Sequence, residues 1–126
     1  MQMTQARTGV DIIEINRIKD AISRWGDHFL GRIYTRSELE ICRGKAESLA
    51  ARFAGKEAVM KTLGGENIVL SWLDIEILSE ESGQPVINLR GQARERCREL
   101  GIDRLEISLA HSRDTAIALV IGLIDF

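Results

Sequence analysis

Glu57 is the residue whose position is hardest to explain as ordinary structure. Residues 47–63 are rich in good helix formers and predict a long helix that ends at the pair Gly64-Gly65. At about 100° per residue, Glu57 shares its direction with the mostly apolar positions 50, 53, 54 and 60, so it falls within the apolar face. A carboxylate buried there is costly unless it is paired or bound to a metal.

Two interpretations of Glu57 stay open at this point. One is an ion pair with Lys61, four residues further along the helix. The other is a metal ligand, which would leave Lys61 free to meet a phosphate. Arg52 and Lys61 both suit phosphate binding, the arginine as a planar fork and the lysine as a point charge. A solvated helix face is the alternative for both, and it is what we expect for Lys56.

Asp11 is the second unusual carboxylate, because it interrupts the apolar run Val10-Asp11-Ile12-Ile13. Aspartate is depleted in strands, so an edge or strand-end position facing solvent is the ordinary explanation. Together, however, Asp11 and Glu57 would supply two hard oxygen ligands from two different elements. Magnesium typically uses one or two carboxylates, with waters and substrate phosphates completing its coordination.

The third candidate, His111, stands at the end of a predicted strand and beside a tight loop. A structural or surface role is common for such a histidine, but a loop position also lets it reach a ligand. Ser108 and Ser112 lie close by in sequence, yet nothing arranges them as a catalytic triad. The attacking group is therefore expected to belong to a substrate, with the protein supplying positioning and charge.

The elements that must position these residues predict an α+β fold. We expect strands at 8–13, 72–78, 86–89, 105–110 and 116–124, and helices at 14–25, 27–34, 35–44, 47–63 and 92–100. In the third helix, Thr35 is the expected N-cap, with Glu38 reaching back to it. Strand 72–78 should turn Asp74 and Glu76 away from its apolar side, and the apolar strand 116–124 should be buried on both faces. This order indicates a largely antiparallel sheet packed with a long helix.

Composition narrows the class of protein. The 126 residues predict one domain, 1–126, with 44% hydrophobic and 29% charged residues. The net charge of −2 gives no reason to expect nucleic acid. No apolar run is long enough to span a membrane, and the polar N-terminus does not read as a secretory signal. Cys42 and Cys97 have no metal-ligand spacing and are expected to be free thiols. We expect a cytoplasmic protein.

Five sequence blocks together resemble the holo-acyl-carrier-protein synthases, the short homotrimeric type within the 4'-phosphopantetheinyl transferase superfamily. The blocks occur in the family's order and extend from Gly9 to Gly122. They are Gly9-Val10-Asp11 with Arg17; residues 34–39; residues 52–58 with Lys61; Trp72, residues 74–76, Gly83 and Pro85; and residues 107–112. Gly55 and Ala110 depart from the residues that are common in the family.

The resemblance implies a Mg²⁺-dependent enzyme that moves the 4'-phosphopantetheine of coenzyme A to a serine of apo acyl carrier protein. The products would be holo acyl carrier protein and adenosine 3',5'-bisphosphate. Asp11 and Glu57 would hold the metal, Lys61 would neutralise phosphate charge, and Arg52 and His111 would contact the phosphates of the nucleotide. The proton of the serine would go to Glu57, to Asp11 or to a water.

The resemblance also implies where partners bind. The carrier would dock on the first predicted helix, where Arg17, Ala21 and Arg24 form one stripe. The short type is a homotrimer with its sites at subunit boundaries. Rival interpretations are a non-catalytic module that binds coenzyme A or a carrier protein, a metal-dependent phosphohydrolase, and a structural subunit in which Glu57 and Lys61 simply pair.

Overall fold

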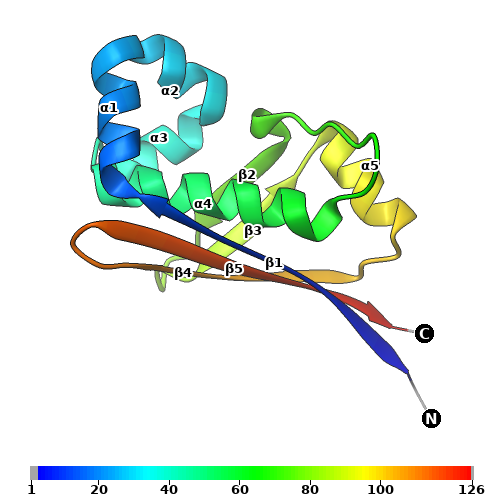
Figure 1. Cartoon of the computed structure of the whole chain (residues 1–126). Helices are drawn as coiled ribbons and strands as arrows, with labels where there is room; N and C mark the ends of the chain where they lie inside the picture. Colours follow the sequence, from blue (N-terminus) through cyan, green and yellow to red (C-terminus); the bar gives the residue numbers. More distant parts are fainter. Residues whose placement is uncertain (1–2, 126) are drawn as a thin grey trace.

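A computed structural model of the chain describes residues 3–125 and confirms the α+β class. Its strands and helices are connected as Figure 1 shows. The strands are β1 (Thr4–Glu14), β2 (Ile75–Ser79), β3 (Pro85–Leu89), β4 (Arg104–His111) and β5 (Thr115–Asp125). The helices are α1 (Ile15–Trp25), α2 (Asp27–Ile33), α3 (Arg36–Cys42), α4 (Ala46–Leu63), the 3₁₀ helix η1 (Trp72–Asp74) and α5 (Gly91–Glu99).

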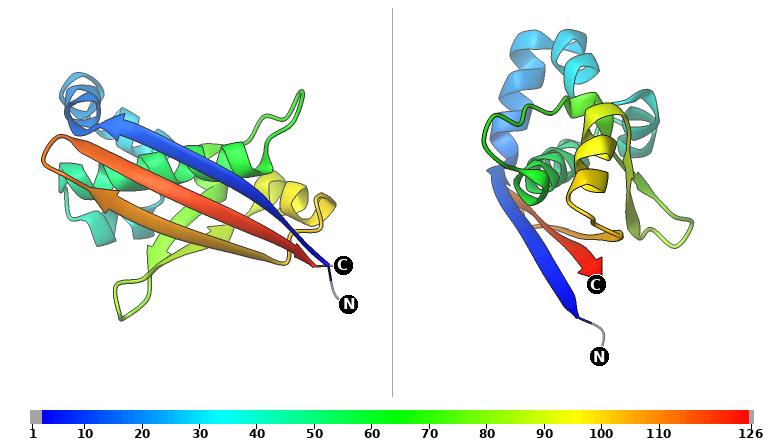
Figure 2. Two further views of the ribbon diagram at one scale, coloured as in Figure 1. Left: turned by 60° about the horizontal axis from the view of Figure 1, so that its bottom comes forward. Right: turned by 90° about the vertical axis from the view of Figure 1, so that its right-hand side faces the viewer.

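The strands form two antiparallel sheets. The larger has three strands in the order β1-β5-β4, and the smaller is the hairpin β2-β3. Register in the larger sheet places Asp11 opposite Ala118, and Ala118 opposite Leu109. Figure 2 shows the three long strands side by side, with α4 lying across one face of the sheet. The predicted antiparallel pairing around a long helix is therefore confirmed.

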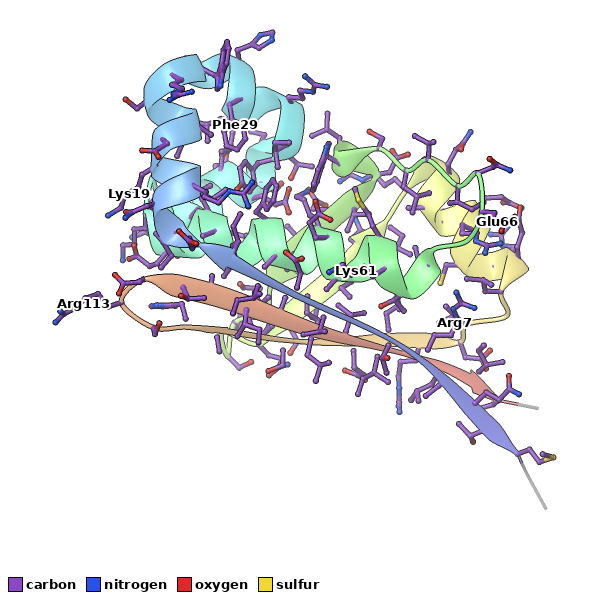
Figure 3. All side chains as sticks on the ribbon, viewed as in Figure 1. Arg7, Lys19, Phe29, Lys61, Glu66 and Arg113 are labelled. Atoms are coloured by element: carbon purple, nitrogen blue, oxygen red, sulfur yellow. The ribbon has the colours of Figure 1, made fainter. Side chains whose placement is uncertain are left out.

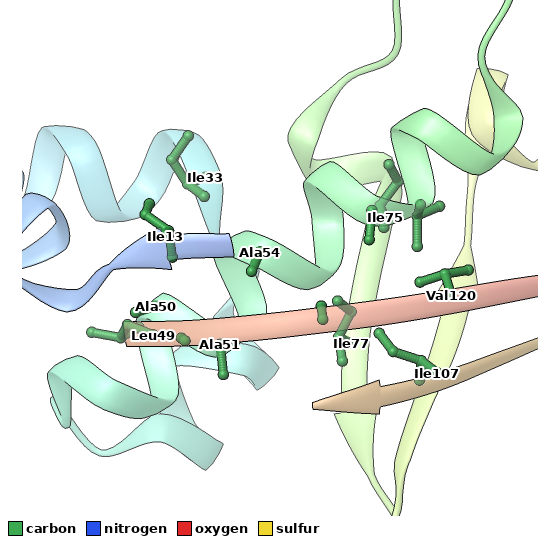
Figure 4. Packing of buried hydrophobic residues seen from close by; sticks show 14 of the residues in the cluster. Ile13, Ile33, Leu49, Ala50, Ala51, Ala54, Ile75, Ile77, Ile107 and Val120 are labelled. Atoms are coloured by element: carbon green, nitrogen blue, oxygen red, sulfur yellow. The ribbon is translucent and has the colours of Figure 1, made fainter. Parts of the chain in front are cut away.

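Small side chains let α4 lie close to the sheet. Ala50, Ala54 and Ala58 recur every four residues along the helix, and all three are fully buried. Ala118 of the central strand is also fully buried. Larger apolar side chains of the core, such as Ile77, Ile107 and Val120, fill the space around this contact (Figure 4). Close approach of helix and sheet brings polar groups on both elements within hydrogen-bonding distance.

The predicted start of α3 is confirmed as a capping box. The hydroxyl oxygen of Thr35 accepts a hydrogen bond from the backbone N–H of Glu38, at 3.3 Å. A carboxylate oxygen of Glu38 accepts one from the backbone N–H of Thr35, at 2.9 Å. The two bonds satisfy donors that a helix N-terminus otherwise leaves without partners.

The predicted strand 72–78 was wrong at its start. Residues 72–74 form the 3₁₀ helix η1, and the strand begins only at Ile75. Glu76 does not face solvent, because its side chain is 2% exposed and accepts hydrogen bonds from Thr35, Asn88 and Arg90. Glu76 lies on the side of the strand opposite Ile75 and Ile77, as the alternation predicts, and that side is covered by polar partners.

Strand β5 is buried on one face only, which corrects the prediction of burial on both. Its inner residues contact α4, whereas Ile117 and Leu119 are 40% and 44% exposed on the other face. Within residues 3–125 no helix covers that outer face (Figure 2). None of the helices in this described part is long and apolar enough to cross a membrane.

Candidate active site

Three of the residues singled out in the sequence come together where β1 crosses α4. Side chains of β1 alternate in direction, and Gly9, Asp11 and Ile13 point toward the helix. Glu57 and Lys61 are one turn apart on α4, so both lie on its side facing β1. Figure 3 shows Lys61 on the helix beside the strand. We call Asp11, Glu57 and Lys61 the acidic–lysine cluster.

Lys61 is bonded to β1 rather than to Glu57. Its ammonium nitrogen lies 3.1 Å from Oδ1 of Asp11 and 2.9 Å from the carbonyl oxygen of Val10. The Lys61 side chain is 54% exposed and that of Asp11 is 17% exposed, so the pair is open to solvent on one side. Asp11 lies on an edge strand of the sheet, as expected for an aspartate in a strand. Its side chain points toward α4, however, and not toward solvent.

Glu57 is half-buried, at the border of the buried face rather than inside it. Burial raises the pKa of its carboxyl group, the negative charge of Asp11 raises it further, and Lys61 lowers it. Two carboxylates therefore repel each other in a partly desolvated place, and the ammonium group of Lys61 offsets part of that repulsion. Such an arrangement favours a bound cation, because a cation would relieve the repulsion.

The donor set of the cluster fits magnesium better than a softer metal. Both carboxylates are hard oxygen donors. Among residues 3–125 there is no group of three or more His, Cys, Asp or Glu side chains that could hold a metal ion. A site with only two protein ligands suits magnesium that also binds waters and substrate phosphates.

The prediction that the Lys56 side chain lies on a solvated helix face was wrong. Its ammonium group is fully buried and lies 2.8 Å from a carboxylate oxygen of Glu38. It also donates hydrogen bonds to the carbonyl oxygens of Trp72 and Ile75. The sequence did hold a signal: of the positions that surround Lys56 on the helix, 49, 53, 59, 60 and 63 are apolar and only Arg52 is polar.

Arg52 and His111 are not part of the acidic–lysine cluster. Arg52 is buried, and its guanidinium group donates to the carbonyl oxygen of Ile77 at 3.0 Å and to the hydroxyl of Ser79 at 2.9 Å. It therefore faces the β2–β3 hairpin. His111 is exposed at the end of β4, separated from β1 by the central strand β5.

The predicted carrier stripe lies on the outside of α1. Arg17 and Arg24 are exposed and Ala21 is half-buried. Together with Asp20 and Trp25 they line a surface hollow of about 260 Å³. Trp25, which was not among the predicted site residues, is 62% exposed at the end of the helix. A large aromatic side chain left open beside two arginines is typical of contact surfaces.

A family model places the chain among known proteins. The model of the 4'-phosphopantetheinyl transferase superfamily matches residues 7–120, which include the whole acidic–lysine cluster. The chain therefore belongs to the 4'-phosphopantetheinyl transferase superfamily, and the resemblance seen in the sequence blocks is confirmed.

Within that superfamily the chain is similar to holo-[acyl-carrier-protein] synthases. It is 54% identical to the one from Dehalococcoides mccartyi strain CBDB1 over 115 residues, covering 91% of this chain and 96% of that protein. It is 46% identical to the one from Herpetosiphon aurantiacus, covering 92% of this chain and 97% of the relative.

Solved structures agree with this placement. The holo-[acyl-carrier-protein] synthase of Helicobacter pylori, in complex with coenzyme A, matches with a TM-score of 0.81 at 36% identity. That match covers 91% of this chain and 98% of the other. The enzyme of Neisseria meningitidis matches with a TM-score of 0.80 at 35% identity, covering 92% and 96%.

Proposed function

We propose that this chain is a holo-acyl-carrier-protein synthase, which transfers 4'-phosphopantetheine from coenzyme A to a serine of apo acyl carrier protein. The observation that carries the proposal is the acidic–lysine cluster. The Lys61 ammonium on α4 lies 3.1 Å from Asp11 on β1, and Glu57 is near enough to Asp11 that the Asp11 charge raises its pKa. The cluster lies in a chain that is about half identical to proteins named for this activity.

The metal of this proposal is Mg²⁺, held by Asp11 and Glu57. When bound, it would stabilise negative charge on the pyrophosphate of coenzyme A as the leaving group departs. Burial and, after it, the negative charge of Asp11 raise the pKa of Glu57, and a bound cation would offset both effects, which supports this assignment.

Lys61 is proposed to contact the phosphates directly. An ammonium group has three donors, and two of them already bond to Val10 and Asp11. The remaining donor and the half-exposed side chain leave Lys61 able to reach a phosphate oxygen. Its present bonds fix the nitrogen beside Asp11, so a phosphate drawn to Lys61 would also lie next to the carboxylates.

The transfer itself exchanges one phosphorus–oxygen bond for another. The serine oxygen of the carrier attacks the phosphorus that bears the pantetheine arm, and the bond from that phosphorus to the bridging oxygen breaks. Adenosine 3',5'-bisphosphate leaves with the bonding electrons. The serine proton passes to Glu57, to Asp11 or to a water held by them. Chemistry of this kind depends mainly on positioning and on charge stabilisation.

Arg52 and His111 are proposed to contact the phosphates of the nucleotide from a neighbouring copy of the chain. Within one chain both lie apart from the acidic–lysine cluster, Arg52 toward the β2–β3 hairpin and His111 beyond β5. An arrangement with sites at subunit boundaries would let them act on a nucleotide bound at the cluster of another copy.

The exposed outer face of the three-stranded sheet supports a homotrimer. Val10, Ile12, Ile117 and Leu119 are 51%, 66%, 40% and 44% exposed and belong to the neighbouring strands β1 and β5. Their pairing in register, Val10 with Leu119 and Ile12 with Ile117, makes one continuous apolar patch. Contiguous exposed apolar surface of this kind marks an interaction site.

The carrier is proposed to dock on α1. Acyl carrier proteins are acidic, and Arg17 and Arg24 give a chain of net charge −2 a local basic surface. Trp25 supplies apolar contact area at the same place. A carrier of fatty acid synthesis and a cytoplasmic location are the further expectations of this function.

The deciding experiment is intact-mass spectrometry of an apo acyl carrier protein incubated with this protein, coenzyme A and Mg²⁺. We expect the carrier to gain the mass of phosphopantetheine, and the gain to be lost with EDTA or with Asp11→Ala or Glu57→Gln. Glu47→Gln, at a half-buried position in the first turn of the same helix, is the matched control and should stay active.

The same experiment separates the rival functions. Release of adenosine 3',5'-bisphosphate without a carrier would indicate a phosphohydrolase. Coenzyme A binding with no mass gain on several carriers would indicate a binding module. Full activity of Glu57→Gln would remove Glu57 from the chemistry and leave it a structural role.

A further inference from the structure

Two arginines that lie far apart in the sequence bind the last carbonyl groups of α4. Arg7, on β1, donates from Nε to the carbonyl oxygen of Thr62 at 2.7 Å and from Nη2 to that of Gly64 at 3.0 Å. Arg96, on α5, donates from Nε to the carbonyl oxygen of Leu63 at 2.8 Å and from Nη2 to that of Gly64 at 3.1 Å. We call these two residues the arginine clamp.

The arginine clamp supplies hydrogen-bond donors to the carbonyl groups at the C-terminal end of α4. The last carbonyl groups of a helix have no partners within the helix, and the helix dipole makes that end negative. Here three consecutive carbonyls accept four bonds from two positive groups, and Gly64 accepts from both. Arg96 is pressed close to the chain that follows, since a Cβ atom on Gly65 would lie 2.7 Å from its Nη2.

Arg7 lies on the same face of β1 as Asp11, and the clamp binds the same helix, α4, that carries Glu57 and Lys61. Arg7, Gly9 and Asp11 alternate along the inner face of β1. Arg7 bonds to Thr62 and Gly64, whereas Asp11 bonds to Lys61, so one side of the strand follows the last turns of α4. Figure 3 shows Arg7 and Lys61 where this strand runs beside the helix. A sliding of β1 along α4 would break the Arg7 bonds and separate Asp11 from Lys61 together.

We infer that Arg7 and Arg96 are positioning residues for the acidic–lysine cluster. This inference rests on the proposed function. Arg7 fixes the register of β1 against α4, and Arg96 holds the carbonyl groups of Leu63 and Gly64 from α5. Neither arginine bonds to Asp11, Glu57 or Lys61, so each acts through the backbone of the helix end and not by touching a phosphate.

Removing the clamp should loosen metal and coenzyme binding more than it lowers stability. For Arg7→Met and Arg96→Met we expect the Mg²⁺ concentration for half-maximal transfer to rise about tenfold, the lower end of the effect of residues that support metal ligands. The affinity for Mn²⁺ measured by calorimetry with coenzyme A present should fall in parallel. Amide hydrogen exchange at residues 62–65 should become faster.

Arg90→Met is the matched control. Arg90 is another partly exposed arginine, and it binds the buried Glu76 on the hairpin side of the molecule. It should lower the melting temperature while leaving the Mg²⁺ requirement and the Mn²⁺ affinity unchanged. Arg7→Lys, which keeps the charge but loses the fork, should fall between Arg7→Met and the unaltered protein, and it decides the matter if Arg7→Met does not fold.

The inference is overturned if the Arg7 and Arg96 variants lower the melting temperature but keep the unaltered Mn²⁺ affinity and Mg²⁺ requirement. Failure of the proposed function looks different. In that case the unaltered protein would transfer nothing to the carrier, whatever the clamp variants do to Mn²⁺ binding and hydrogen exchange.

Discussion

The ammonium group of Lys56 lies 2.8 Å from a carboxylate oxygen of Glu38, and both side chains are fully buried. Glu38 also accepts a hydrogen bond from the backbone N–H of Ile77, at 2.9 Å. The pair therefore links α3, α4 and β2 inside the protein. Burial lowers the pKa of Lys56, and the charge of Glu38 opposes that shift. Removing one partner alone would leave the other as an unpaired charge.

Replacing Lys56 with methionine should strongly destabilise the fold. Methionine fills similar space, but it leaves the Glu38 carboxylate buried without its counter-ion. Breaking a buried pair in this way costs about 3–5 kcal/mol. Urea unfolding followed by circular dichroism would measure the loss in free energy of unfolding.

The double variant Glu38→Gln/Lys56→Met is the control for this reasoning. Glutamine keeps a hydrogen-bond acceptor near Thr35 and Ile77 but carries no charge, so the double variant should be more stable than Lys56→Met alone. A loss below about 1 kcal/mol for Lys56→Met, the scale of an exposed pair, would contradict the buried-pair account.

Gly9→Ala should destabilise the contact between β1 and α4. A Cβ atom at position 9 would lie 2.5 Å from Oγ1 of Thr62 and would overlap the carbonyl oxygen of Ala58. Because both neighbours belong to the packed helix, β1 would have to move, at a cost of about 1–3 kcal/mol. Thermal unfolding would measure this, and transfer activity should fall because Asp11 lies two residues away on the same face.

Gly31→Ala is the control for Gly9→Ala, because it makes the same chemical change where we expect no loss of stability. Gly31 is inside α2, and an added Cβ there has no atom within 4 Å. Alanine favours helix over glycine by up to about 1 kcal/mol, so this variant should be as stable as the unaltered protein or more so. Equal melting temperatures for the two variants would argue against the tight packing at Gly9.

Local patterns predicted the elements well because their causes are local. The capping box at Thr35 and Glu38 depends on residues three apart, and the structure contains it as predicted. The long helix α4 and the antiparallel class also follow from propensity and periodicity. The sequence singles out Asp11, Glu57 and Lys61, but the bond between Lys61 and Asp11 is not predicted, because it needs the pairing of β1 with β5 and the packing of β1 on α4.

The wrong predictions share one physical origin. Lys56 and Glu76 are polar residues whose partners lie far away in sequence, at Glu38 and at Thr35, Asn88 and Arg90. A single element cannot reveal such partners, so the prediction of exposure for Lys56 was wrong and the burial of Glu76 was not predicted. The exposed outer face of β5 is the converse case, since apolarity was taken as burial within one chain.

Glu76 should give the protein a stability that is lost in acid. Burial opposes ionisation of Glu76, but hydrogen bonds from Thr35 and Asn88 and the charge of Arg90 dominate and lower its pKa below the ordinary 4.5. A carboxyl group whose pKa is lower in the folded than in the unfolded state stabilises the fold above the unfolded pKa. That contribution disappears as the pH falls through the folded pKa, below 4.5.

Denaturant unfolding at several pH values, with Glu76→Gln beside the unaltered protein, checks this dependence. The difference in unfolding free energy should be largest near neutral pH and should shrink below pH 4.5. Glu81→Gln, at an exposed position in the hairpin turn, should show a small difference at every pH. A Glu76 difference that is constant down to strong acid would mean that ionisation of this group does not stabilise the fold.

Charge on the outer face of the sheet should break the proposed trimer. Leu119→Lys places an ammonium group in the apolar patch formed by β1 and β5, where burial against another copy would desolvate it. Sedimentation velocity should give three times the 14.1 kDa chain mass for the unaltered protein and a single chain mass for the variant.

The control for this experiment is Val69→Lys, which puts the same charge on an apolar residue that is 84% exposed in the loop after α4. It lies outside the sheet, so the assembly should keep its mass. A single chain mass for the unaltered protein would remove the trimer from the proposal. A trimeric Leu119→Lys variant would move the interface away from this face.

Reversing the charge of Arg24 should weaken the encounter with the carrier protein without altering the chemistry. Arg24 is exposed on the last turn of α1 and lies outside the acidic–lysine cluster. Opposite charges mainly speed association, so Arg24→Glu should raise the KM for the carrier on the order of tenfold while kcat and the KM for coenzyme A stay unchanged. Steady-state rates at low and high salt would show this, and the effect should be larger at low salt because ions screen exposed charges.

Arg94→Glu, which makes the same change at an exposed position on α5, should leave the KM for the carrier unaltered. Equal effects of the two variants would show that net charge, and not the surface of α1, governs carrier binding.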